Sequence, residues 1–261
     1  MMLLSRRCFL AAAASVAICT GANAQDVPVI AAAASLKFPL EEIARDFRKD
    51  TGLEVRISFG ASGNFVRQIL QGAPFQMFMA ADEESIHRVA EQGKARDAGA
   101  VYAVGRIVIF AATGSPLKAD GSLADLRAAL GDGRVKRFAI ANPEHAPYGR
   151  AAEQALRSQG LWDAIRPTLV LGENVSQAAQ FAASGTAQGG IFAYSLAISP
   201  AVTERGSYAL LPAEWHDPLR HRMVLLRSAG ETARRFYEYV QTPPAHATFR
   251  RYGLVQPGEN G

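Results

Sequence analysis

The chain has 261 residues, of which 49% are hydrophobic and 20% are charged. Its 28 basic and 24 acidic residues give a net charge of +4, an excess too small to favour a nucleic-acid-binding protein. Beyond the first 24 residues, no apolar run approaches the roughly 18 residues that a membrane-spanning helix needs. We therefore expect one large domain or two small lobes, built around a hydrophobic core.

The first 24 residues have the three parts of a signal peptide. Arg6 and Arg7 precede the apolar residues 11–20, and Ala22-Asn23-Ala24 supplies the small residues of a cleavage site. The arginine pair, followed by Phe9-Leu10, favours the twin-arginine export route, although a general secretory signal can also contain two arginines. We therefore predict a signal peptide over residues 1–24 and a mature protein in the periplasm.

Both cysteines, Cys8 and Cys19, lie within the predicted signal peptide. Removing these 24 residues leaves 237 of the 261, with 26 basic and 24 acidic side chains and a net charge of +2. The mature protein then has no thiol. This excludes a disulfide, a cysteine-bound metal and a cysteine nucleophile.

Segments of strand length alternate with amphipathic helical patterns along the rest of the chain. Strands are expected at residues 27–32, 54–58, 75–80, 106–111, 138–141, 168–171, 190–193 and 223–226. Helices are expected between them, for example where Leu40, Ile43 and Phe47 recur at helical spacing and where Asp82 can cap the helix that follows it. The alternation predicts an α/β fold, with a parallel-type sheet covered by helices on both faces.

Small polar residues lie at four of the expected strand-to-helix junctions. These junctions are Ala34-Ser35, Gly60-Ala61-Ser62-Gly63, Pro147-Tyr148-Gly149 and Asn174-Val175-Ser176. In open α/β sheets, ligands bind at the carboxyl ends of strands, where helix N-termini present unpaired N–H groups and a partial positive charge. A single junction of this kind is explained by the ordinary use of serine, asparagine and glycine in helix caps and turns. Four together indicate an anion-binding site.

Several stretches of the sequence resemble, in order, the periplasmic molybdate-binding proteins of ABC transporters. The stretches are residues 31–36 (AAAASL), 58–63 (SFGASG), 68–69 with 72–74 (QI and GAP), 80–82 (AAD) and 142–149 (NPEHAPYG), and the last of these is the most specific. The resemblance covers essentially the whole mature chain. It implies a two-lobed class II periplasmic binding-protein fold, in which each lobe is a mixed sheet flanked by helices and the ligand lies in the cleft between the lobes.

The resemblance also implies where the lobes begin and end. One lobe would comprise residues 25–107 and 221–261, and the other would comprise residues 108–220. The two segments that cross between the lobes are expected near residues 108–112 and 221–224. The first lobe is formed by two separate segments of the sequence, because the chain returns to it after completing the second lobe.

The ligand residues follow from the same resemblance. Ser35 and Ser62 match the family's hydroxyl ligands in the first lobe. Tyr148 and Val175 match ligands in the second lobe, Val175 through its backbone N–H group. The resemblance therefore implies an oxyanion site shared between the lobes.

Three further residues are candidates for the same site, namely Leu36, Gly63 and Tyr194. Some members of the family bind the anion with a tyrosine in the segment that matches residues 190–193. In this chain Tyr194 falls one residue late, and strand alternation places it on the same side as the apolar Phe192. We therefore expect Tyr148, from another loop, to supply the phenol.

The chemistry of the four junctions fits a tetrahedral oxyanion, whose oxygens only accept hydrogen bonds. The hydroxyls and N–H groups could supply about seven donors, each contributing roughly 1.5–3 kcal/mol to a charged partner. The junctions contain no arginine or lysine, although Arg67 and Arg150 follow two of them, and a carboxylate ligand would usually be met by a bidentate arginine. The junctions also contain no aspartate or glutamate that could accept a proton from hydrogen phosphate, which favours a fully deprotonated anion. The resemblance implies that this anion is molybdate or tungstate, that no cofactor is needed, that the partner is a membrane permease and that the protein is a monomer.

Other interpretations stay open at this point. Sulfate, phosphate or another tetrahedral oxyanion could occupy the same site. A serine hydrolase is a weaker alternative, because the segment from Gly60 to Gly63 is one residue shorter than the G-x-S-x-G motif. A zinc site built from His216 and His221, with His145 or His87, has no thiol or H-E-x-x-H motif to support it. The chain is therefore predicted to be a binding protein that carries no bare metal ion, rather than an enzyme.

Overall fold

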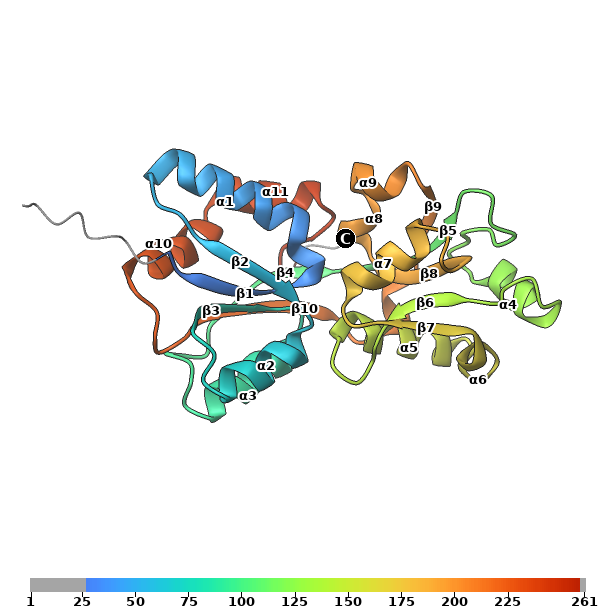
Figure 1. Ribbon diagram of the computed structural model, residues 1–261, viewed down its shortest axis with the longest axis horizontal. Helices are drawn as coiled ribbons and strands as arrows, with labels where there is room; N and C mark the ends of the chain where they lie inside the picture. Colours follow the sequence, from blue (N-terminus) through green and yellow to red (C-terminus); the bar gives the residue numbers. More distant parts are fainter. Residues whose placement is uncertain (1–26, 259–261) are drawn as a thin grey trace, which may run out of the picture.

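The computed structural model describes residues 27–258, so the predicted signal peptide lies outside the described residues. The chain forms two lobes that lie side by side along the long axis of the molecule (Figure 1). Each lobe is built on a five-stranded mixed sheet with helices on its faces. The predicted two-lobed α/β fold is confirmed.

The first lobe has the strand order β2-β1-β3-β10-β4. Strand β1 pairs in parallel with β2 and β3, whereas β10 is antiparallel to β3 and β4. Helices α1, α10 and α11 cover one face of this sheet, and α2 and α3 cover the other (Figure 1). The bounds are β1 Val29–Ala33, η1 Ala34–Leu36, α1 Lys37–Thr51, β2 Arg56–Gly60, α2 Ser62–Leu70, β3 Phe75–Ala80, α3 Glu83–Glu91, β4 Ala100–Gly105, β10 Leu219–Leu225, α10 Glu231–Val240 and α11 Pro243–Arg251.

The second lobe has the strand order β7-β6-β8-β5-β9. Strand β6 pairs in parallel with β7 and β8, whereas β5 is antiparallel to β8 and β9. The bounds are β5 Ile107–Ala112, α4 Ala124–Gly131, β6 Phe138–Ala141, α5 Pro147–Ser158, α6 Trp162–Ile165, η2 Arg166–Thr168, β7 Leu169–Gly172, α7 Val175–Ala183, β8 Gly189–Ala193, α8 Tyr194–Ala197, α9 Pro200–Thr203, β9 Gly206–Leu210 and η3 Ala213–Trp215.

All eight predicted strands overlap strands of the structure, but β4 and β9 were not predicted. Both are edge strands of their sheets. Only Arg106 separates β4 from β5, so the two strands have the apolar pattern of one longer run. Strand β9 is partly exposed and alternates weakly. The predicted cap is confirmed, because the Asp82 carboxylate accepts a hydrogen bond of 3.0 Å from the Ser85 N–H group.

The chain crosses between the lobes a few residues earlier than expected in both places. It leaves the first sheet at Arg106 and returns to it between η3 and β10. Residues 108–112 and 221–224, where crossings were expected, lie inside β5 and β10, because these strands begin directly after the crossings. The division into residues 25–107 with 221–261 and residues 108–220 stays a prediction.

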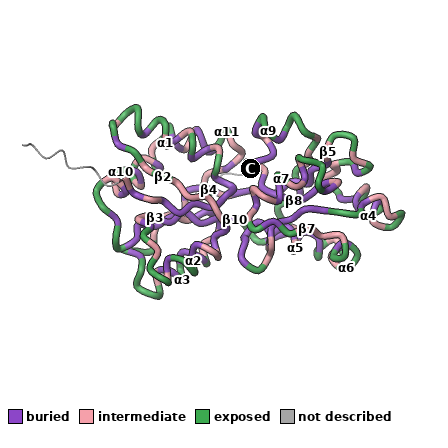
Figure 2. The backbone as a smooth tube through the Cα atoms, in the orientation of Figure 1, coloured by how far each residue is buried: buried purple, intermediate pink, exposed green. Residues whose placement is uncertain are grey.

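The hydrophobic core follows both sheets and continues through the junction of the lobes (Figure 2). One apolar cluster contains Ile30 and Met79 from the first lobe together with Ile140 and Ile191 from the second. No helix between residues 27 and 258 combines the length and the apolar character that crossing a membrane requires. Because this core is filled with apolar side chains, a polar ligand can bind between the lobes only at the polar ends of the strands.

Candidate functional site

The four polar junctions meet between the lobes, around one small cavity. Ser35 follows β1, Ser62 begins α2, Tyr148 lies in the first turn of α5, and Val175 begins α7, and all four line the cavity. They meet because neighbouring parallel strands end at the same edge of each sheet, and the two edges face each other. The remaining lining residues are Ala33, Ala34, Gly60, Ala61, Ala81, Ala146 and Pro147.

Two serine hydroxyls are buried at this cavity and can donate into it. Ser62 is fully buried, and its Oγ accepts a hydrogen bond of 3.0 Å from the Ala81 N–H group, which leaves the hydroxyl proton of Ser62 available. Ser35 is also fully buried, and its Oγ has no hydrogen-bond partner within residues 27–258. Buried hydroxyls in native proteins nearly always have a partner, so the Ser35 hydroxyl indicates a place for a ligand.

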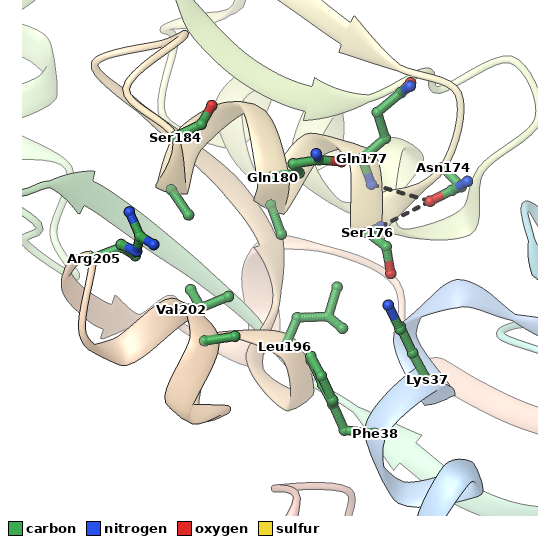
Figure 3. A pocket seen from close by; sticks show the side chains of 13 residues that line it. Lys37, Phe38, Asn174, Ser176, Gln177, Gln180, Ser184, Leu196, Val202 and Arg205 are labelled. Carbon is green, nitrogen blue, oxygen red and sulfur yellow. Dashed lines mark hydrogen bonds between the residues drawn. The ribbon is translucent and has the colours of Figure 1, made fainter.

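Backbone N–H groups at the helix starts add further donors. The first N–H groups of a helix have no partner inside the helix. Within the described chain, no side chain caps η1, α2 or α5. Helix α7 is capped by Asn174, which accepts from the N–H groups of Ser176 (3.0 Å) and Gln177 (3.1 Å), as drawn in Figure 3. That cap does not engage the N–H group of Val175, the group that the resemblance implies as a ligand.

Tyr148 joins the two lobes behind the cavity. Its Oη lies 3.1 Å from Nε2 of His221, which belongs to β10 of the first lobe. Burial raises the pKa of Tyr148 above its ordinary value, and the nearby polar side chain of Ser35 offsets part of this rise. Burial lowers the pKa of His221 to about 3. Both side chains are therefore neutral near pH 7.

The low pKa of His221 predicts that acid weakens the fold. An unfolded chain takes up a proton on this imidazole at a pKa near 6.5, whereas the folded protein does so only near pH 3. The contribution of His221 to the free energy of unfolding is therefore complete above pH 6.5. It is lost at roughly 1 kcal/mol per pH unit as the pH falls towards 3. Urea unfolding at pH 7 and pH 5 should show this loss.

His221→Phe provides the comparison, because His216 also has a lowered pKa and contributes in the same direction. The variant should lose roughly 2 kcal/mol less than the parent protein between pH 7 and pH 5. An identical pH dependence in both proteins would show that His221 is not buried in its neutral form.

The lobes touch each other directly around the cavity. The Gly63 N–H group donates to the His145 carbonyl at 2.9 Å. The Ser176 hydroxyl donates to the Ala34 carbonyl at 2.9 Å, and the Ser195 hydroxyl donates to the Ser35 carbonyl at 2.7 Å. Two side-chain pairs also bridge the lobes, Arg150 with Asp82 and Asn64 with Glu173. The structure is therefore that of a closed cleft.

The three remaining candidates do not line the cavity. Leu36 is buried at the end of η1, directly before α1, and the N–H group of Gly63 is occupied by the His145 carbonyl. The Tyr194 ring lies 5.8 Å from the ring of Tyr208, measured between centroids, and Tyr194 is not among the residues that line the cavity. The structure brings together four of the seven candidate residues.

Two cavities lie between the lobes, and they differ in chemistry. The small one has a volume of about 10 Å³, comparable to a single water site, so an anion of several atoms fits there only if the surrounding loops move apart slightly. A larger and more open one, of about 620 Å³, lies between Lys37 and Phe38 of the first lobe and helices α7 to α9, with Arg205 at its far side (Figure 3). None of the four converging residues lines the larger cavity. The donors converge only on the small one.

The lining of the small cavity is electrically neutral. Among the described residues that form it there is no lysine, arginine, histidine, aspartate or glutamate. The partner of Ser62 Oγ is a backbone N–H group, and a hydrolytic serine would need a base in that place. The described residues also contain no cluster of three histidine, cysteine or acidic side chains that could hold a metal ion. The arrangement suits binding of an anion by neutral donors.

Known proteins are similar to this chain in sequence and in fold. The family of bacterial extracellular solute-binding proteins matches residues 28–255. The molybdate-binding protein ModA of Rhodobacter capsulatus is 36% identical over 230 residues, 87% of each chain, and that of Escherichia coli K12 is 30% identical over 254 residues, 95% and 96% of the two chains. The periplasmic molybdate-binding protein of Azotobacter vinelandii superposes with a TM-score of 0.79 at 32% identity, covering 88% of this chain and 99% of that one. The chain therefore belongs to the bacterial extracellular solute-binding proteins, in the family of the molybdate-binding proteins.

Proposed function

We propose that this protein captures molybdate or tungstate in the small cavity between its lobes and delivers the anion to an ABC importer. The observation that carries the proposal is the convergence of buried neutral donors, among them the Ser35 hydroxyl, which has no partner within residues 27–258. Such donors suit an ion whose oxygens only accept hydrogen bonds. The family consists of binding proteins rather than enzymes, and the proposed activity is binding alone, without a cofactor.

The proposed ligands are Ser35 and Ser62 through their hydroxyls, Tyr148 through its phenol and Val175 through its N–H group. Each hydrogen bond to a charged oxygen contributes roughly 1.5–3 kcal/mol before losses are counted. Removing the ion from water and closing the lobes offset much of this sum. The result is expected to lie between a micromolar and a nanomolar dissociation constant, roughly −8 to −12 kcal/mol.

The proposed place of action is the periplasm, where the protein acts as a monomer and meets a membrane permease. The proposal rests on the signal sequence over residues 1–24 and on the family, whose members are extracellular solute-binding proteins. Cell fractionation tests it: mature protein recovered only from the cytoplasm would contradict this location.

Molybdate and tungstate are expected to bind at least about tenfold more tightly than sulfate, a difference of about 1.4 kcal/mol. A fixed set of neutral donors fits one size of oxyanion best, and proton-donating forms such as hydrogen phosphate meet no acidic side chain among the described lining residues. Isothermal titration calorimetry with molybdate, tungstate, sulfate and phosphate measures the difference.

Sulfate is the second candidate ligand, because the fold alone does not distinguish the two anions. The sulfate-binding protein SubI of Mycobacterium tuberculosis has the same fold at 16% identity, with a TM-score of 0.70. Equal or tighter binding of sulfate would transfer the proposal to that anion. Heat signals at the dilution level for all four anions would contradict an oxyanion-binding function.

A further inference from the structure

Tyr148 and His221 form a buried polar pair across the junction of the lobes. The Tyr148 Oη and the His221 Nε2 are 3.1 Å apart, and both side chains are buried. Gly105 makes room for the pair, because a Cβ atom at this position would overlap the Tyr148 hydroxyl and lie 3.0 Å from the His221 Nε2. The ring of Tyr102 packs edge-on against the imidazole, with ring centroids 6.0 Å apart. The surroundings thus fix the imidazole next to the phenol.

The hydrogen bond can run in either direction, and the other imidazole nitrogen decides which. The Nδ1 of His221 is buried and has no hydrogen-bond partner within residues 27–258. If the phenol donated to Nε2, the single proton of the neutral ring would sit on Nδ1 as a buried N–H without an acceptor. A buried donor left unpaired is rare in native proteins, and an unpaired acceptor is tolerated better. The geometry therefore favours the proton on Nε2.

With the proton on Nε2, the imidazole donates to the Tyr148 Oη and occupies a lone pair of the phenol. The phenol must then direct its own proton away from His221. Tyr148 lines the cavity together with Ser35 and Ser62, so the cavity is the polar region that this proton can face. Donation to the phenol oxygen also polarises the O–H bond and strengthens it as a donor.

We propose that His221 is a positioning residue that holds Tyr148 with its phenolic proton directed at the bound oxyanion. This inference rests on the proposed function for its ligand, a tetrahedral oxyanion. The position of the imidazole proton does not depend on that function. His221 belongs to the first lobe and Tyr148 to the second, so the pair also sets how one lobe presents its donor to an ion held by the other.

Nitrogen-15 NMR of the imidazoles in the unmodified protein tests the assignment directly. We expect the His221 signals to show a neutral ring protonated on Nε2 at pH 7, with and without molybdate. His221→Phe identifies the signals, since the other four histidines remain. A neutral ring protonated on Nδ1, or a charged ring, would overturn the inference whatever the protein binds.

The binding test compares two variants of His221, one that removes the hydrogen-bond donor and one that keeps a donor. His221→Phe keeps an aromatic ring without a donor, and His221→Gln places an amide donor near the position of Nε2. His221→Phe should weaken molybdate binding about fivefold or more, whereas His221→Gln should stay within about threefold of the parent protein. Equal affinities for the parent and His221→Phe, or an equal loss in both variants, would overturn the positioning role.

A double-mutant cycle separates positioning from a general structural effect. In the Tyr148→Phe background there is no phenolic proton to direct, so His221→Phe should change the molybdate affinity by less than about twofold. An undiminished effect in that background would show that His221 acts by another route. If the parent protein binds none of the tested anions, the proposed function fails, and the NMR result still decides the direction of the hydrogen bond.

Discussion

Gly63→Ala is expected to weaken molybdate binding by at least about 100-fold, because the added methyl group prevents the lobes from closing. A Cβ atom at this position would lie 2.7 Å from the carbonyl oxygen of His145 and 3.1 Å from its Cα. Both atoms belong to the backbone, so no side-chain rotation relieves the overlap. The proposed ligands Tyr148 and Val175 lie across the cleft from Ser35 and Ser62, and losing two hydrogen bonds to a charged ion costs roughly 3–6 kcal/mol.

Calorimetry measures the affinity, and small-angle scattering measures whether molybdate still compacts the protein. Gly131→Ala is the matched control, because a Cβ atom on Gly131 would meet no atom within 4 Å. Alanine favours helix formation over glycine, so Gly63→Ala in α2 should not lower the melting temperature of the ligand-free protein. Parental affinity in Gly63→Ala would show that binding does not need this closed contact.

Tyr148→Phe should weaken molybdate binding by roughly 1.5–3 kcal/mol, about 10- to 150-fold, because it removes one donor to a charged acceptor and keeps the ring. Tyr148 is buried and lines the cavity. Tyr194→Phe is the matched control and should change the affinity less than about threefold, because Tyr194 packs against Tyr208 and Gly253 instead.

Titration of both variants with molybdate decides between the two phenols. An unchanged affinity in Tyr148→Phe together with a large loss in Tyr194→Phe would show that Tyr194, and not Tyr148, supplies the phenol. Melting temperatures of the ligand-free variants are the check on folding, since Tyr148→Phe also removes the hydrogen-bond partner of the His221 Nε2.

Much of the fold follows from local patterns that the sequence displays. Strands such as β3 and β6 are short buried runs bounded by turns and helices, and their ends were predicted to the residue. The edge strands β4 and β9 were missed for different reasons. Strand β4 merges with β5 into one apolar run, and β9 is partly exposed, so neither strand has a pattern of its own.

The site was predictable where it depends on the junctions between strands and helices. The junctions that contain Ser35, Ser62 and Val175 could be found because helix N-termini after parallel strands converge in this class of fold, and the family resemblance singled out these residues within them. Contacts between distant segments leave no such signal. The pairing of Tyr148 with His221, 73 residues later in the chain, depends on how the two lobes pack. The contact of Gly63 with His145 depends on closure of the cleft.

The neutral lining of the cavity has an electrical consequence. No described side chain in the lining carries a positive charge that could cancel the ion, and none can take up or release a proton near pH 7. Capture of a dianion would therefore lower the net charge of the chain by two, from +4 to about +2. The loaded form would focus at a lower isoelectric point than the empty form. The long-range field of the protein would then report its occupancy independently of its shape.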